Sequence, residues 1–271
     1  MAMTVNTNSY SLNAQRSLAR TQGDLATSME RLSSGLRINR AKDDAAGLAV
    51  AQRMEGQARG AAVAQRNIGD GLSYLQVANS ALNDIGENLQ RMRELAVQSQ
   101  NGTYTSGDRE KMATEFNQLR QEISGAITRA TFNGVGVVSG GAKLIYVDGN
   151  GNNITISGGG GSTTLGIAAT VSISGADGTA ATSALTAVSA SLNNLATALS
   201  SVGAYQSRLE KAMSSAMAIE EAQWSSRGRI MDADFAKETS RMTSAQIVQQ
   251  AGVSALAQAN GIPQLALGLL G

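Results

Sequence analysis

The chain has 271 residues, a formal net charge of +1, 42% hydrophobic residues and only 3% aromatic residues. With such a balanced charge, the chain shows no excess of basic residues for binding nucleic acid or anionic membranes. The low aromatic content argues against a large ordinary globular core. The absence of Cys and His excludes disulfides, thiolate metal sites and His-dependent catalytic dyads. We therefore expect no cofactor, no metal site and no enzymatic activity, and no nucleic acid as a partner.

The N-terminal segment predicts a helix after a short irregular start. Residues 1–10 are polar and β-branched, and a helical pattern follows from about Leu12 to Leu36. The polar run 39–44 then predicts a joint between two helices. The apolar seam of this first helix has 4-3-4 spacing and consists of Leu25, Met29, Leu32 and Leu36.

A second, much longer helix is predicted over residues 43–100. Gly56, Gly60, Gly69 and Gly71 lie within it and each weaken it by about 1 kcal/mol relative to Ala, so either the helix bends there or close packing requires the missing side chains. Its apolar positions recur by threes and fours, as in helices that pack along a seam. These positions are Ile68, Leu72, Leu75, Leu82, Ile85, Leu89, Met92 and Ala96.

A loop over residues 101–108 should turn the chain back into a third helix that ends near Ala130. Ser106 or Asp108 can cap this helix. One apolar face is predicted to pack against the preceding helix. It is formed by Met112, Phe116, Leu119, Ile123 and Ile127.

Residues 131–178 are rich in glycine and predict β structure. Two short alternating runs, KLIYV and NITIS, flank the turn residues 148–151, which indicates a β-hairpin. The remainder of the segment is predicted to be strand and loop. A calcium loop is excluded, because its sixth and twelfth positions would be Asn153 and Gly159 instead of Gly and Glu.

The last part of the chain predicts two more helices, over residues 180–224 and 232–259, with Ser225–Arg229 as the joint and Asn260–Pro263 as the end. The final helix places Ile247 and Ala251 on one face, with Leu256 beside it. The first of the two carries a seam that matches the long helix of the first half. It consists of Leu185, Val188, Leu192, Leu195, Leu199, Val202, Leu209, Met213 and Ala216.

Together these patterns predict a mainly α fold: a long antiparallel coiled-coil helical rod built from both chain halves, with a small β-hairpin region in the middle. Two acidic pairs, Asp43-Asp44 and Glu220-Glu221, leave acid or metal chemistry formally possible, but helix caps and surface ion pairs explain them better. Trp224, the only tryptophan, is interpreted as packing between segments. The predicted segments are 1–43, 44–130, 131–178, 179–225 and 226–271.

Both ends of the chain carry long sequence signatures. The N-terminal part contains SLNAQRSLARTQGDLATSMERLSSGLRINRAKDDAAGLAVAQRM, GDGLSYLQVANSALNDIGENLQRMRELAVQSQNGT and TFNGVGVVSG. The C-terminal part contains SRGRIMDADFAKETSRMTSAQIVQQAGVSALAQANGIPQLALGLLG. These segments cover about two-thirds of the chain, in order, and they resemble bacterial flagellin. A helical rod, a β-hairpin and little or no outer domain are what the resemblance implies for the fold.

The resemblance also changes the expected location. Without an apolar signal segment or a membrane-spanning run, the sequence by itself suggests the cytoplasm. Flagellins, however, leave the cell unfolded through the flagellar export channel and form an extracellular filament. The resemblance implies as partners further copies of the chain, the flagellar export apparatus, an export chaperone, and cap and junction proteins. It also implies a vertebrate innate immune receptor, with Arg91, Leu95 and Glu115 at the matching positions.

The expected function is structural polymerisation through the two chain ends. Residues 1–43 and 226–271 would be the polymerisation element: they would leave apolar stripes uncovered in a single subunit, be mostly disordered there, and become ordered on assembly. Leu25, Met29, Leu32 and Leu36 would then face Ile247, Ala251 and Leu256, or a neighbouring subunit. A hook-filament junction protein with flagellin-like ends is the alternative. A flagellin with an enzymatic insert is disfavoured by the lack of His and the short middle segment.

Overall fold

The computed structural model describes residues 8–156, 165–166, 168, 170–175 and 178–268, the last seven for their backbone only. The chain forms two compact units. The central unit comprises residues 57–221, and the terminal unit comprises residues 1–56 and 222–271. Each of the two longest helices, α2 (Ala45–Ser99) and α5 (Thr179–Met231), contributes to both units.

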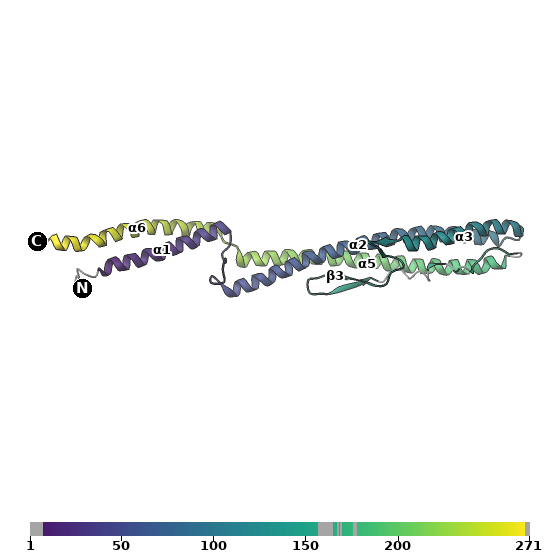
Figure 1. The fold of residues 1–271 in the computed structure, drawn as a ribbon, viewed down its shortest axis with the longest axis horizontal. Coiled ribbons are helices and arrows are strands. Elements are labelled where there is room, and N and C mark those ends of the chain that lie inside the picture. The colour runs from purple at the N-terminus through teal and green to yellow at the C-terminus, as the bar shows by residue number, and fades with distance from the viewer. Residues whose placement is uncertain (1–7, 157–164, 167, 169, 176–177, 269–271) are drawn as a thin grey trace. The chain divides into compact units, whose positions relative to one another are not determined.

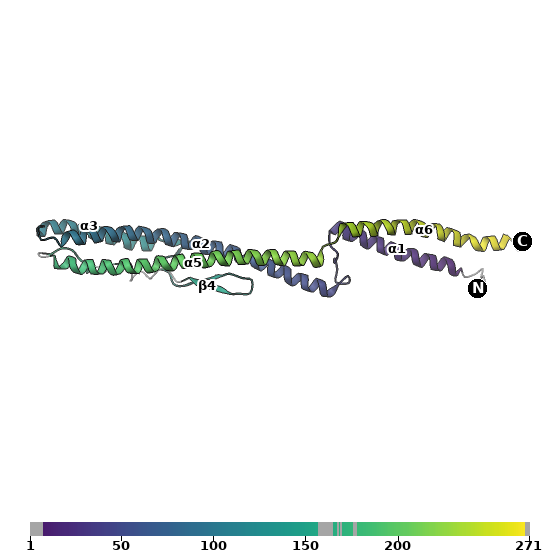
Figure 2. The ribbon, with the colours of Figure 1, turned by 180° about the vertical axis from the view of Figure 1, so that it is seen from behind.

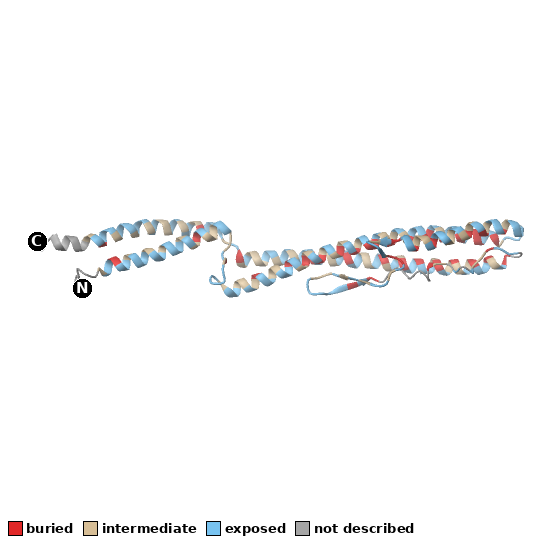
Figure 3. Ribbon diagram, viewed as in Figure 1, coloured by how far each residue is buried: buried red, intermediate tan, exposed pale blue. Residues whose placement is uncertain are grey.

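In the central unit, α2 and α5 run antiparallel beside α3 (Ser106–Arg129), as Figures 1 and 2 show from opposite sides. Contacts advance along α2 from Gln65 to Gly86 while their partners on α5 recede from Glu220 to Leu195. Buried residues gather along the facing sides of these helices (Figure 3). The prediction of a mainly helical fold that pairs the two chain halves is confirmed. The largest fully buried members include Ile68, Leu75, Leu82, Ile85, Leu89, Met92, Phe116 and Ile123.

The start of α3 differs slightly from the prediction. The N-cap is Thr105, whose Oγ1 accepts a hydrogen bond from the backbone N of Asp108 at 3.3 Å. The carboxylate of Asp108 in turn accepts from the backbone N of Thr105 at 3.2 Å, which completes a capping box. Neither Ser106 nor Asp108 is therefore the cap, although Asp108 contributes to it.

The predicted hairpin is confirmed. Strands β3 (Lys143–Tyr146) and β4 (Asn153–Ile156) pair antiparallel, with Lys143 opposite Ile156 and Tyr146 opposite Asn153. In the turn, Asp148 Oδ1 accepts hydrogen bonds from the backbone N of Asn150 and of Asn152, at 2.9 and 2.8 Å. The side chains of Ile154 and Ile156 are buried against the helices, so the hairpin is anchored on the central unit.

A second, smaller hairpin was not predicted. Strand β1 (Thr131–Phe132) pairs with β2 (Val135–Gly136), and the turn residues Asn133 and Gly134 have φ of 50° and 75°. Positive φ at both positions is typical of the Asn-Gly turns that join two adjacent strands. In contrast, the described residues within 165–178 contain no strand, so the expectation of further strand there is wrong for that part.

Two predicted helix ends are also wrong. Residues 225–229 are not a joint, because α5 continues through them to Met231 and the break falls at 232–234. Helix α6 (Phe235–Gly268) likewise continues through Pro263 instead of ending at Asn260. The joint predicted at 39–44 does lie between helices, since α1 (Ser9–Ser34) ends before it and α2 begins after it.

Candidate functional site

The candidate site is the pair formed by α1 and α6 in the terminal unit, where segments from the two chain ends lie side by side (Figures 1 and 2). The connector that follows α1 and the connector that precedes α6 are joined by backbone hydrogen bonds. The N–H of Arg37 donates to Met231 O at 2.6 Å, and the N–H of Ala233 donates to Gly35 O at 2.9 Å. Asp234 then caps α6, because its Oδ1 accepts from the backbone N of Ala236 at 3.0 Å. These backbone hydrogen bonds thus hold the end of α1 next to the start of α6.

The seam between α1 and α6 is built mainly from small and polar side chains. The less exposed residues recur at heptad spacing on both helices, as expected for two helices that pack along their length. Only a minority of them are large and apolar. On α1 they are Ser11, Ala14, Leu18, Thr21, Leu25, Ser28 and Leu32, and on α6 they are Glu238, Met242, Ala245, Gln249, Gly252, Leu256 and Ala259.

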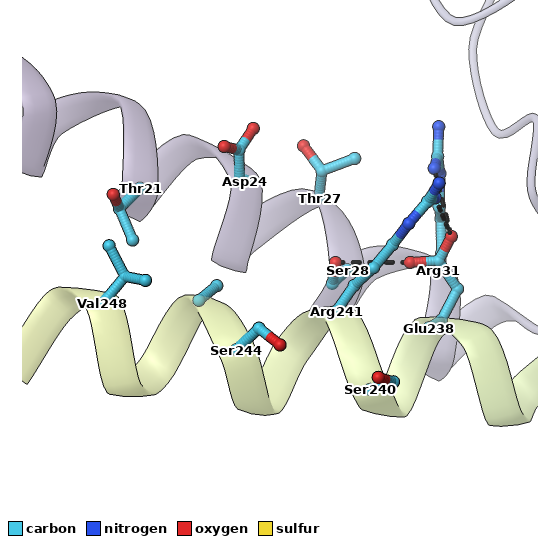
Figure 4. Close-up of a pocket in the computed structure, with 11 residues that line it drawn as sticks. Thr21, Asp24, Thr27, Ser28, Arg31, Glu238, Ser240, Arg241, Ser244 and Val248 are labelled. Atoms are coloured by element: carbon cyan, nitrogen blue, oxygen red, sulfur yellow. Dashed lines mark hydrogen bonds and ion pairs between the residues drawn. The ribbon is translucent and has the colours of Figure 1, made fainter.

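A buried carboxylate fixes one end of this seam. Glu238 is 4% exposed, and its carboxylate accepts hydrogen bonds from Ser28 Oγ at 3.3 Å, Arg31 NH1 at 3.2 Å and Arg241 NH1 at 3.0 Å (Figure 4). A carboxylate taken out of water needs such partners, because an unpaired buried charge is strongly destabilising. The cluster therefore ties α6 to α1 at a defined register.

A groove runs along one side of the pair. It consists of a hollow of about 460 Å³ next to Glu238 and a second of about 520 Å³ between Tyr10 and Ala259. On α1, Tyr10, Ser17 and Asp24 lie seven residues apart and line the two hollows in turn. Residues seven apart share a helix face, so both hollows open on the same side. We call this surface, lined on α6 by Ser244, Val248, Gly252, Ala255 and Ala259, the lateral groove.

Large apolar side chains are left uncovered on the pair, both in the lateral groove and outside it. Ile247 is 62% exposed and lies half a turn away from the seam residues Ala245 and Gln249. No charged residue follows Arg241 on α6. The exposed set on the two helices comprises Tyr10, Leu12, Met29, Phe235, Ile247, Val248 and Val253.

The seven residues predicted as a polymerisation seam divide into two groups. Four are half-buried and lie within the chain's own packing: Leu25, Leu32, Leu36 and Leu256. The other three, Met29, Ile247 and Ala251, are exposed. Both terminal segments are helical and paired in the single chain, which differs from the expectation of mostly disordered ends.

The three residues matched to an innate-receptor contact lie on α2 and α3. Arg91 Nε donates to Glu115 Oε1 at 2.8 Å, and Arg91 NH1 donates to Glu94 Oε2 at 3.0 Å. These two bonds raise the pKa of Arg91 above its ordinary value, and the bond to Glu115 has the larger effect. The side chain of Arg91 therefore stays positively charged. Leu95, in contrast, is only 2% exposed and belongs to the core of the central unit.

The acidic residues noted in the sequence have structural roles. Asp44 Oδ1 accepts from the backbone N of Gly47 at 2.8 Å at the start of α2, and Glu220 accepts from Gln65 Nε2 at 2.6 Å. Within the described residues, no three His, Cys, Asp or Glu side chains gather as metal ligands would. Trp224 is 39% exposed, and the guanidinium carbon of Arg227 lies 5.5 Å from its ring centre.

The described part of the chain also includes no helix with the length and apolarity to cross a membrane. What the geometry defines is a helical subunit whose two chain ends combine into one helix pair with uncovered apolar faces. Proteins of this class assemble with other protein molecules through such uncovered faces.

Comparisons with known proteins identify the family. Residues 5–143 match the bacterial flagellin N-terminal helical region, and residues 185–270 match the bacterial flagellin C-terminal helical region. The flagellin of Xenorhabdus nematophila is 38% identical, and the flagellar filament core protein flaB2 of Brachyspira hyodysenteriae is 37% identical. These alignments cover 100% and 99% of this chain, respectively, and 100% of each relative. The chain belongs to the bacterial flagellin family.

A solved structure is similar as well. The crystal structure of Bacillus cereus flagellin superposes with a TM-score of 0.51 at 25% identity, over 56% of this chain and 88% of that one. The protein is accordingly a structural, non-enzymatic subunit that polymerises with copies of itself into the extracellular flagellar filament for motility. The full-length match to filament proteins decides against the junction-protein alternative.

Sequence reasoning missed the polar character of the α1–α6 seam. The signal was present, because Ser11, Ser28 and Glu238 occupy heptad positions that a large apolar side chain would normally fill. The prediction of the seam relied instead on the large apolar residues of the same segments.

Proposed function

We propose that the α1–α6 pair is the polymerisation element of this flagellin, within the predicted segments 1–43 and 226–271, while residues 44–225 form the body of the subunit. The observation that carries this proposal is the inverted distribution of side chains. Small and polar residues fill the seam within the chain, whereas Ile247, Met29 and Leu12 are about half exposed or more. Covering the exposed half of each such side chain contributes about 1 kcal/mol or slightly more, which a neighbouring molecule can supply.

The contact between copies is heterologous. Ile247 lines neither hollow of the lateral groove and lies at its rim, half a turn from the seam, so one copy's groove can receive the next copy's Ile247 side chain. Such an interface does not close on itself and grows into a helical filament. Small groove residues such as Ser244 and Ala255 allow a helix to approach closely.

Cysteine cross-linking tests this arrangement cleanly, because the chain has no native Cys. One variant carries Ile247→Cys, and a second set carries Ser244→Cys, Val248→Cys or Ala255→Cys in the groove. Filaments grown from a mixture of Ile247→Cys subunits and one groove variant should form disulfide-linked dimers on mild oxidation. Filaments of each variant alone should not.

Two outcomes would refute the arrangement. Dimers in filaments of Ile247→Cys alone would mean that like faces meet, since cross-linked Cys residues need Cα atoms within about 7 Å. Mixed filaments that cross-link at none of the groove positions would show that Ile247 faces something else. Unassembled mixtures at the same concentration provide the background.

The same exposed residues suggest how the other expected partners act. Before assembly, an export chaperone would cover Ile247, Val248 and Val253, which otherwise expose apolar surface to water. The export apparatus would pass the chain unfolded through the channel, and cap and junction proteins would meet it at the filament ends. Pull-down of the chaperone with full-length chain and with an Ile247→Ser, Val248→Ser double variant measures the first of these contacts.

A vertebrate innate receptor is a further proposed partner, supported by the exposed Arg91–Glu115 ion pair on α2 and α3. Leu95 would act only through packing, because its side chain is buried. Soluble subunit should stimulate a receptor-reporter cell line, and Arg91→Ala should weaken this response while the neighbouring exposed Arg93→Ala leaves it unchanged. The proposal would be refuted if the parent protein gave no reporter response, or if both variants weakened the response equally.

A further inference from the structure

Asn8 makes two hydrogen bonds, one of which joins the opposite ends of the chain. Its Oδ1 accepts from the backbone N of Ser11 at 3.1 Å, which makes Asn8 the N-cap of α1. Its Nδ2 donates to the backbone O of Ala259 on α6 at 2.8 Å. The two bonds use the acceptor and the donor of one amide, so this orientation of the side chain satisfies both.

The carbonyl of Ala259 needs this external donor because of Pro263. In an α-helix, the carbonyl of residue 259 accepts from the N–H of residue 263, but proline has no N–H and its ring crowds that carbonyl. Helix α6 nevertheless continues to Gly268. Ala259 is 8% exposed, so little water can reach its backbone. A buried carbonyl without a donor is destabilising, and proline usually ends or bends a helix for this reason.

We infer that Asn8 is a positioning residue that supplies the donor missing at Pro263. It thereby keeps the last turns of α6 helical and fixes the register of α6 against α1 at the end remote from Glu238. The consequence for assembly rests on the proposed role of this pair in polymerisation. The effect of Asn8 on the helical structure of α6 does not depend on that proposed role.

Three variants of the full chain separate this role from simple capping. Asn8→Ser retains a good N-cap but is too short to reach Ala259. Pro263→Ala restores a backbone N–H that can pair with Ala259 within α6, so Asn8→Ser in that background should have no effect. Asn88→Ser is the matched control, because Asn88 Nδ2 donates to Asp84 O at 3.0 Å on α2, and that carbonyl keeps its helical partner.

Hydrogen exchange of the amides in residues 259–268 is the direct readout. Asn8→Ser should accelerate exchange there about tenfold, which is the loss expected when a buried acceptor is left unpaired. Asn88→Ser should not change it, and Asn8→Ser, Pro263→Ala should match Pro263→Ala alone. The critical concentration for filament growth should rise about tenfold in Asn8→Ser.

Unchanged exchange in Asn8→Ser would overturn the inference, and so would an effect that persists in the Pro263→Ala background. If exchange behaves as expected but the critical concentration does not move, Asn8 still positions α6. In that case the proposed role of the helix pair in polymerisation is the part that fails.

Discussion

Gly60 on α2 and Gly149 in the β3–β4 turn touch through their backbones: a Cβ built on Gly60 would lie 2.9 Å from the Cα of Gly149. The same applies in reverse, because a Cβ on Gly149 would meet the Cα of Gly60 at 3.0 Å. The tip of the hairpin is therefore held against the helix by a contact that no other pair of residues permits. Of the four glycines predicted to allow close packing, Gly60 and Gly71 do so, whereas Gly56 and Gly69 have open space around the Cβ position.

Replacement of Gly60 should separate helix propensity from packing. Ala is favoured over Gly by about 1 kcal/mol within a helix, so Gly69→Ala should stabilise the protein by about that amount. Gly60→Ala gains the same propensity but displaces the hairpin tip, and it should destabilise by about 1–3 kcal/mol. Urea unfolding of both variants provides the comparison. Equal stabilisation by the two substitutions would mean that the hairpin does not rest on Gly60.

Loss of the buried carboxylate of Glu238 should loosen the α1–α6 pair. Glu238→Ala leaves Arg31 and Ser28 without their partner and should cost about 3 kcal/mol of local stability. Arg241→Ala removes a half-exposed partner and should cost less than about 1 kcal/mol. The rate of hydrogen exchange of the amides along α1 measures the loss of local stability in both variants. Comparable effects of the two variants would argue against a central role for Glu238.

Acid should destabilise the central unit, because it protonates two carboxylates that accept hydrogen bonds, one at the start of α3 and one in the β3–β4 turn. The Thr105 hydroxyl lowers the pKa of Asp108 below 3.8, and the Asn152 side chain does the same for the pKa of Asp148. Because each folded pKa lies below the unfolded value, the stabilisation is fully present above about pH 4–5 and is lost as the pH falls through the folded pKa. The urea midpoint should therefore drop between pH 5 and pH 2. Thr105→Ala should lower the midpoint at pH 7 and flatten this dependence; an unchanged slope would assign the acid sensitivity to other groups.

Removal of α6, by a stop after Asp234, should abolish filament growth without unfolding the central unit, whose helix contacts lie within residues 57–221. Sedimentation after seeding with wild-type filament fragments measures the first effect, and circular dichroism at 222 nm measures the second. Seeded growth of the truncated chain would contradict the assignment of the polymerisation element. A variant with only residues 269–271 removed serves as the length control.

Much of the central unit follows from hydrophobic periodicity. The seams of α2 and α5 were predicted residue by residue, because burial within one chain and a spacing of three or four coincide there. The β3–β4 hairpin followed from alternation around Asp148–Gly151. The β1–β2 hairpin could have been found too, since Asn133-Gly134 is the same kind of turn signal.

The terminal unit was harder to predict, for two physical reasons. Helix ends there depend on contacts far away in sequence, such as the Arg37 N–H to Met231 O bond at one joint and the Asn8 amide near Pro263. In addition, periodicity cannot tell whether a large apolar residue is covered by its own chain or by another molecule. Leu256 and Ile247 look alike in the sequence, yet one is half-buried and the other exposed.

The polar contacts at Asn8 and Glu238 lie about 20 residues apart on each helix, so they hold the α1–α6 pair at both ends of a span of about 30 Å. Between them the seam contains small residues such as Ala14 and Gly252, whose side chains do little to oppose a shift of one heptad. The two end contacts are what make a shifted pairing unfavourable. Substitutions within the span should therefore be tolerated as long as side chains stay small, whereas a change at either end would let the subunit adopt more than one length.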